Sequence, residues 1–197
     1  MEHALVFLPL LGSIISGFFG RYIGDRNSEI VTSLFVSISA ALSLIIFYQV
    51  IVNSYENNLI IATWMNSGLL DVNWSIKVDT LSSVTSVVVC LVSPIVLIYS
   101  LGYMSHDPYK TRFMSYLSFF TFAMLMLVTS DNFLQLFFGW EGVGLCSYFL
   151  IGFWFKKDSA NAAAIKAFIV NRVGDFGFAL GIFLIFLSDF FMFCSDF

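Results

Sequence analysis

The chain has 197 residues, of which 59% are hydrophobic, 18% aromatic and only 11% charged. Soluble domains average about 45–50% apolar and about 25% charged residues, so this composition excludes an ordinary soluble domain and indicates a membrane protein. The formal net charge of −4 arises from scattered carboxylates, and the chain has no basic patch of the kind that binds nucleic acid.

Six apolar runs are close to the length of about 20 residues that a helix needs to cross roughly 30 Å of hydrocarbon. They cover residues 4–19, 30–52, 81–103, 113–129, 133–155 and 160–187. We therefore predict an all-α membrane protein with six transmembrane helices, in one membrane domain that extends over residues 1–197.

The first run, residues 4–19, has the position of a signal peptide but lacks its flanks. Glu2 and His3 precede it in place of basic residues, and Pro9 interrupts it. No clear small-residue cleavage site follows, so we predict a mature helix.

Residues 53–78 form the longest segment between apolar runs. Several β-branched residues occur there in an alternating pattern, and Trp64 and Trp74 are typical of the headgroup region of a membrane. The pattern predicts a short β-hairpin that lies at the outer membrane interface.

The basic residues of the short loops indicate the orientation, because lysine and arginine are enriched on the side where the chain is made. With the amino terminus outside, six of the nine basic residues fall in the predicted inner loops: Arg21, Arg26, Lys110, Arg112, Lys156 and Lys157. Lys77 lies in an outer loop, and the remaining two basic residues are in the sixth run.

The fifth run, residues 133–155, contains Glu141. At about 1.5 Å per residue, this acid lies about 12 Å below the outer boundary, near the midplane. A charge at that depth costs several kcal/mol, roughly 2.5–3.5 on insertion scales, and is a functional candidate by default. No cation stands three or four residues away in the same helix. Glu141 therefore needs a partner from another helix, which we expect in a neighbouring polypeptide, or has to be neutral at rest.

The sixth run, residues 160–187, contains Lys166, Arg172 and Asp175. Asp175 lies about 22 Å from the inner end of this run, with Arg172 about 4–5 Å nearer the inner side. Their spacing of three residues places both on one face of the helix, where they can pair. A self-contained ion pair and a charge pathway are both compatible with this spacing.

The acid in the fifth run suggests a proton or cation relay, because a buried carboxyl group can switch its protonation when a neighbouring charge changes. A structural buried acid is the alternative. Metal and nucleotide sites are not indicated: Cys90, Cys146 and Cys194 are isolated, and the glycines of residues 139–144 follow the order G-x-x-G-x-G without a preceding strand.

Two motifs in the last two runs resemble a known family. Gly-Trp-Glu-Gly-Val-Gly-Leu occupies residues 139–145, and Asn-Arg-Val-Gly-Asp-Phe-Gly occupies residues 171–177. Together with the stretches at 103–108 and 112–118, they are similar to NADH dehydrogenase subunit 5, the distal antiporter-like subunit of respiratory complex I. The similarity extends over essentially the whole chain.

The resemblance implies the amino-terminal part of an antiporter-like helical bundle that takes part in proton pumping. In this family the fifth-helix glutamate, which matches Glu141, pairs with a lysine of a broken seventh helix along a hydrated axis of charges. The sixth-helix acid and arginine match Asp175 and Arg172, and Lys166 falls in the same stretch. We therefore expect these four residues to form a proton relay in a proton-translocating NADH:ubiquinone oxidoreductase.

The resemblance also implies where the redox chemistry takes place. The chain has neither a dinucleotide-binding fold nor cluster-ligating cysteines, so we expect no cofactor here, and FMN, iron–sulfur clusters and ubiquinone in partner subunits. The expected partners are other complex I membrane-arm subunits, including a neighbouring antiporter-like subunit, and membrane lipids. The expected location is the mitochondrial inner membrane, with a bacterial plasma membrane as the alternative.

Members of this family are much longer and continue beyond the sixth helix. We therefore expect one piece of a split subunit, with a separately encoded carboxy-terminal half as a further partner. A structural remnant without its own proton path is one alternative, and a subunit of a multi-subunit cation/proton antiporter is the other.

Overall fold

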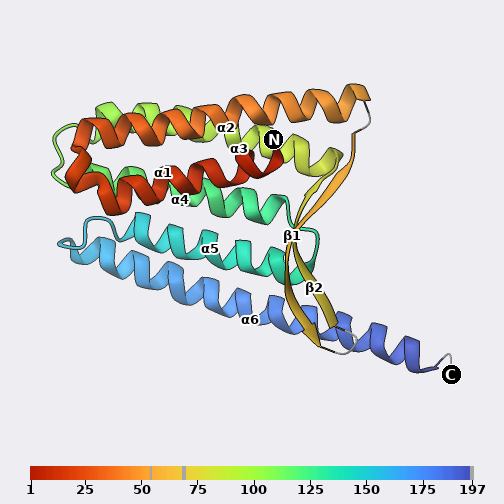
Figure 1. The fold of residues 1–197 in the computed structure, drawn as a ribbon. Coiled ribbons are helices and arrows are strands. Elements are labelled where there is room, and N and C mark those ends of the chain that lie inside the picture. The colour runs from red at the N-terminus through yellow and green to blue at the C-terminus, as the bar shows by residue number, and fades with distance from the viewer. Residues whose placement is uncertain (54, 68–69, 196–197) are drawn as a thin grey trace.

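The computed structural model describes residues 1–53, 55–67 and 70–195, and long helices account for most of them (Figure 1). The helices are α1 (Glu2–Ile23), α2 (Asp25–Asn53), α3 (Thr80–Tyr103), α4 (Lys110–Val128), α5 (Phe133–Ile151) and α6 (Asp158–Ser195). Each of the six contains a stretch that is long and apolar enough to cross a membrane, which confirms the predicted fold class.

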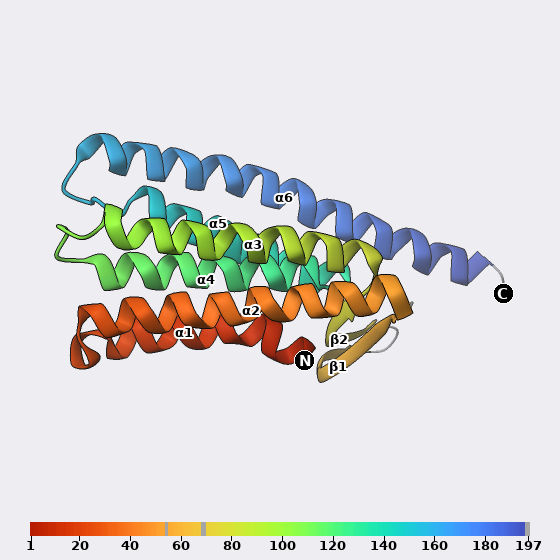
Figure 2. The ribbon, with the colours of Figure 1, turned by 90° about the horizontal axis from the view of Figure 1, so that it is seen from above.

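The helices lie side by side in a bundle (Figure 2). Helix α4 packs against α1, α2, α3 and α5, whereas α6 packs against α5 at the edge of the bundle. Of the apolar stretch of α4, 44% of the residues are buried, compared with 6% for α6. The contact between α5 and α6 is therefore the place where α6 meets the rest of the described chain.

Short polar residues and one glycine set the ends of several helices. Gly24 follows α1 with a φ of 87°, which glycine adopts more readily than other residues, and the chain turns directly into α2. Asp79 caps α3 by accepting the N–H of Ser82 at 2.7 Å, and the Ser82 hydroxyl accepts the N–H of Asp79 at 2.8 Å. Asn132 caps α5 by accepting the N–H of Gln135 at 2.8 Å.

Hydroxyl groups connect α1 to α2 and α4 around a proline. Pro9 has no N–H, so the carbonyl of Leu5, one turn earlier, has no helical partner. Ser39 of α2 donates to that carbonyl at 2.7 Å, and Ser118 of α4 donates to the carbonyl of Pro9 at 2.7 Å. An unpaired carbonyl inside a membrane costs several kcal/mol, so the Ser39 hydroxyl compensates for the donor that the proline lacks, while Ser118 adds a contact between α1 and α4.

The hairpin predicted between residues 53 and 78 is present. Strands β1 (Asn57–Ser67) and β2 (Leu70–Val78) pair in antiparallel order at the end of the bundle where α3 and α5 begin (Figure 1). Gln135 of α5 is fully buried, accepts the N–H of Ser75 at 3.0 Å and donates to the Ser75 carbonyl at 2.6 Å. This side-chain amide takes the place of a neighbouring strand and fixes β2 to α5.

An aromatic cluster also joins the hairpin to α5. The rings of Trp64 and Trp74 meet edge to face with 5.0 Å between their centroids, and Trp74 meets Phe138 of α5 at 5.0 Å. Such pairs add about 0.5–1.5 kcal/mol each beyond the area that they bury. The depth of both tryptophans at the headgroups stays a prediction.

The boundary between the fifth and sixth helices differs from the predicted one. Helix α5 ends at Ile151, four residues before the end of the predicted run, and α6 begins at Asp158. The chain turns between them, where the N–H of Lys157 donates to the carbonyl of Trp154 at 2.9 Å. The indole N–H of Trp154 donates to Asp107 at 3.2 Å, so the last apolar residues of the run make loop contacts in place of a helical turn.

Candidate functional site

Helix α5 approaches α4 closely at two glycines. A Cβ built on Gly139 would lie 2.7 Å from the backbone N and Cα of Leu127, which is closer than non-bonded atoms tolerate. A Cβ on Gly142 would meet the Cβ of Ala123 at 3.2 Å. The two glycines therefore let the helices come together, as small residues do at interfaces between membrane helices.

This close approach sets the rotation of α5. Successive residues are about 100° apart around a helix, so with Gly139 toward α4 the next two residues point away from α4. Those residues are Trp140 and Glu141. Gly144 marks the direction of α6, because a Cβ built on it would lie 3.7 Å from the Asn171 side chain of α6. Around the axis of α5, Trp140 and Glu141 lie on either side of this direction. The local sequence thus directs one indole and one carboxylate toward α6.

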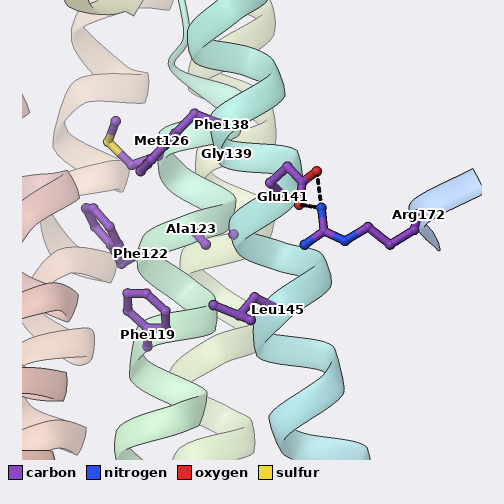
Figure 3. Close-up of a pocket in the computed structure, with 10 residues that line it drawn as sticks. Phe119, Phe122, Ala123, Met126, Phe138, Gly139, Glu141, Leu145 and Arg172 are labelled. Carbon is purple, nitrogen blue, oxygen red and sulfur yellow. Dashed lines mark hydrogen bonds and ion pairs between the residues drawn. The ribbon is translucent and has the colours of Figure 1, made fainter. Parts of the chain in front are cut away.

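Glu141 of α5 and Arg172 of α6 form an ion pair between the two helices (Figure 3). Nη1 of Arg172 donates to both carboxylate oxygens of Glu141. The guanidinium carbon also lies 4.8 Å from the ring centroid of Phe168, one turn earlier on α6, which adds a cation–π contact.

The origin of this cation corrects one expectation. The prediction that the partner of Glu141 comes from another helix is confirmed. The expectation that it comes from a neighbouring polypeptide is wrong, because α6 of the same chain supplies Arg172. The sequence of α5 shows that no cation lies within one helical turn of Glu141. Which cation of another helix pairs with Glu141 depends on how α6 packs on α5.

Asp175 is buried, with 6% of its surface exposed, at the contact between α5 and α6. Its Oδ1 accepts the indole N–H of Trp140 at 2.8 Å, and its Oδ2 lies 3.7 Å from Nη1 of Arg172. The ion pair predicted from the three-residue spacing is therefore present. One guanidinium nevertheless serves two carboxylates, and its hydrogen bonds go to Glu141.

The structure brings Glu141, Arg172 and Asp175 together and leaves Lys166 apart. Lys166 is exposed and precedes Arg172 by six residues, about 9 Å along the helix axis. Among the described residues, no carboxylate forms an ion pair with it. The part of Trp140 was not foreseen, although its indole N–H, in an apolar helix beside a buried acid, is a donor that needs an acceptor.

A cavity of about 300 Å³ lies beside the ion pair (Figure 3). Apolar side chains of α4 and α5 line most of it, among them Phe119, Phe122 and Leu145, while Glu141 and Arg172 form its charged edge. A water molecule in such a space needs two to four polar partners. We therefore expect water next to the ion pair and not along the phenylalanine-lined remainder.

Two further ion pairs lie away from this cluster. Lys110 at the start of α4 is 3.3 Å from Glu29 of α2, and Lys77 of β2 is 3.4 Å from Asp131 before α5. Within residues 1–53, 55–67 and 70–195, no three His, Cys, Asp or Glu side chains are grouped so that they could hold a metal ion. The charges that meet between α5 and α6 are those of Glu141, Arg172 and Asp175.

The described residues form six membrane-length helices, and one guanidinium is held between two carboxylates where the last two helices meet. These features define a multi-pass membrane protein with charges between two of its membrane-length helices. The same fold occurs in the structure of the membrane-bound sulfane sulfur reductase, an archaeal respiratory membrane complex. The two chains superpose with a TM-score of 0.77 over 94% of this chain and 37% of the other, at 17% sequence identity. This likeness shows the fold.

Family models make the match specific. Residues 64–114 match the model of the N-terminus of NADH-ubiquinone oxidoreductase (complex I) chain 5. Residues 130–189 match the model of the transmembrane domain of NADH:quinone oxidoreductases and Mrp antiporters. The second matched segment includes both motifs, at residues 139–145 and 171–177.

Individual relatives agree with these models. NADH-ubiquinone oxidoreductase chain 5 of Triticum aestivum and of Arabidopsis thaliana are each 57% identical, over 93% and 92% of this chain. NADH-quinone oxidoreductase subunit L of Rhodobacter capsulatus is 52% identical over 96% of it. The chain belongs to the family of complex I chain 5, which confirms the resemblance seen in its motifs. It spans 27% of the length of each of these relatives.

Proposed function

We propose that this chain supplies the first six helices of the antiporter-like subunit of a proton-translocating NADH:quinone oxidoreductase, and that its charge cluster is part of the proton path. The observation that carries the proposal is the position of Arg172 between Glu141 and Asp175. It supports the proposal because one cation shared by a buried acid, Asp175, and a partly buried one, Glu141, can change the protonation of both.

The proposed step is a transfer of the guanidinium from one acid to the other. While Arg172 is on Glu141, the carboxylate is stabilised in its ionised form. When Arg172 moves toward Asp175, Glu141 loses its counter-charge in apolar surroundings and takes up a proton, and the return of the arginine releases that proton. A change of field from quinone reduction in other subunits would drive the transfer.

The partners and the membrane belong to the same proposal. The relatives are named as subunits of NADH-ubiquinone and NADH-quinone oxidoreductases, which does not favour a cation/proton antiporter. We propose that FMN, iron–sulfur clusters and ubiquinone are held by other subunits, and that further membrane-arm chains cover α6. The similarity to plant chain 5 proteins supports the mitochondrial inner membrane. Lys166 is proposed as an outlying charge on the inner side of the path.

Glu141→Gln in the assembled complex tests the proposal. The substitution keeps the shape of the side chain and removes its ability to ionise. We expect NADH-driven proton translocation in sealed vesicles to be largely lost while the complex still assembles. Glu56→Gln is the matched control, because Glu56 is exposed and lies between α2 and the hairpin, outside the predicted spans.

The outcomes separate three interpretations. Loss of translocation in Glu141→Gln alone supports a place in the proton path. Normal translocation per NADH in an assembled Glu141→Gln complex refutes the proposed role and favours a structural piece of the membrane arm. Cation exchange without NADH, in the absence of flavin-bearing and cluster-bearing subunits, favours the antiporter.

A further inference from the structure

The two oxygens of Asp175 have different partners. Oδ1 accepts the indole N–H of Trp140 at 2.8 Å, while Oδ2 lies 3.7 Å from Nη1 of Arg172. The first partner is neutral and comes from α5, and the second is charged and comes from α6 itself. Because Asp175 is buried, each oxygen needs a donor from the protein.

Trp140 is held in the orientation that this hydrogen bond requires. Its ring meets Phe178 of α6 nearly edge to face, with 6.2 Å between centroids and 70° between ring planes. Half of the Trp140 surface is exposed, so close packing on all sides does not fix the indole. The contact with Phe178 and the hydrogen bond to Asp175 therefore set its position.

The hydrogen bond from Trp140 to Asp175 affects which of the two carboxylates, Glu141 or Asp175, binds Arg172. Asp175 stands three residues after Arg172 on the same face of α6, which is a favourable spacing for a direct ion pair. Glu141 is reached only across the interface between the helices. Without the indole N–H, the buried Asp175 carboxylate would lack a donor at Oδ1 and would attract the guanidinium more strongly.

We propose that Trp140 is a positioning residue, which keeps Arg172 on Glu141 by satisfying Asp175 with a neutral hydrogen bond. This inference rests on the proposed function for its physiological meaning, because the resting position of Arg172 is what proton uptake would change. Packing of an aromatic ring alone is the competing explanation for a tryptophan at this place. A ring without the N–H distinguishes the two.

Trp140→Phe keeps an aromatic ring and removes the donor. A lost hydrogen bond to a charged group shifts an equilibrium about 10- to 100-fold, so the ratio of Glu141-bound to Asp175-bound Arg172 should fall by that factor. Trp154→Phe is the matched control, because it removes an indole–carboxylate hydrogen bond to Asp107 in a loop. Structures of the assembled complex, determined for each variant, show the arginine directly.

Asp175→Asn is the variant for which the opposite result is expected, with Arg172 remaining on Glu141. Asparagine still accepts the indole N–H but no longer attracts a cation, so Arg172 should stay on Glu141, both in Asp175→Asn and in the double variant with Trp140→Phe. A purely structural contact predicts that Trp140→Phe and Asp175→Asn disturb Arg172 alike. If Arg172 stays on Glu141 in Trp140→Phe, or leaves it equally in both single variants, the inference is overturned.

Proton translocation, measured on the same samples, separates this inference from the proposed function. We expect translocation per NADH to fall in Trp140→Phe, to be unchanged in Trp154→Phe, and to be no lower in the Trp140→Phe/Asp175→Asn double variant than in Asp175→Asn. An arginine that moves in Trp140→Phe without any change in translocation supports the positioning role of Trp140 and refutes the proton path.

Discussion

The contact between Gly139 and the backbone of Leu127 predicts a large effect from one methyl group. In Gly139→Ala the new Cβ would lie 2.7 Å from two backbone atoms and 2.8 Å from the Leu127 Cβ, whereas ordinary contact begins at 3.4 Å. The helices must therefore separate by about 0.7 Å, the difference between 3.4 and 2.7 Å. Overpacking of this kind costs about 1–3 kcal/mol, with backbone neighbours at the upper end because backbone cannot rotate away.

A gain in helix propensity partly offsets this cost. Alanine is better than glycine in a helix by about 1 kcal/mol, so a steric cost of about 3 kcal/mol leaves a net destabilisation of about 2 kcal/mol. Substitutions of two other glycines, which have more space around them, serve as comparisons for the stability of Gly139→Ala. Gly142→Ala meets the Ala123 Cβ at 3.2 Å and should be nearly neutral, and Gly102→Ala meets nothing within 4 Å and should be neutral or slightly stabilising.

The assay is the apparent midpoint of thermal unfolding of the purified complex, together with the amount that assembles. We expect Gly139→Ala to have the lowest midpoint of the three variants and Gly102→Ala the highest. A Gly139→Ala complex as stable as Gly102→Ala would show that α4 and α5 are not in backbone contact at this point. The contact at Gly139 would then not set the rotation of α5 that directs Trp140 and Glu141 toward α6.

Two further predictions concern the end of the bundle at which the hairpin lies. Gln135→Leu should leave the Ser75 N–H and carbonyl without partners, which costs about 1–3 kcal/mol for each buried group. Amide hydrogen exchange at Ser75 should therefore become faster. Unchanged exchange there would contradict the role of Gln135 in fixing the hairpin. Asp79→Ala should remove the cap of α3 at a cost of about 0.5–2 kcal/mol. The hydrogen bond from the Ser82 N–H lowers the pKa of Asp79 below its ordinary 3.8. The cap therefore stabilises the fold above pH 3.8, and this stabilisation is lost as the pH falls through the lowered pKa. If the unfolding midpoints of Asp79→Ala and the unaltered chain differ by the same amount at pH 7 and in strong acid, this explanation is refuted.

The helices and the hairpin could be predicted because each depends on local information. Apolar runs of membrane length define the six spans, and the alternating segment before residue 79 defines β1 and β2. The helix ends were less predictable, as the fifth run shows. Trp154 belongs to the same apolar run, but its indole N–H donates to Asp107 in a loop distant in sequence, and α5 ends at Ile151. Apolar composition alone does not report such a contact.

The charged residues of the site could be identified from the sequence, but their pairing could not. A carboxylate or guanidinium in an apolar run is conspicuous because placing a charge in the hydrocarbon layer costs free energy, so Glu141, Arg172 and Asp175 were all candidates. The spacing of Arg172 and Asp175 favours a pair within α6, and nothing in that spacing refers to α5. The stronger contact, Arg172 with Glu141, depends on how α5 is rotated against α4, and that depends on Gly139.

The same geometry indicates which partner of the ion pair would move in the proposed transfer. Helix α5 is fixed on two sides near Glu141: Gln135 binds the backbone of Ser75, and Gly139 leaves no space between α5 and Leu127. The carboxylate of Glu141 also sits on a short side chain. The guanidinium sits on a long flexible side chain that is 46% exposed, and it already lies within 4 Å of both acids. A change in pairing therefore requires only rotation about the side-chain bonds of Arg172, with α5 and the hairpin left in place.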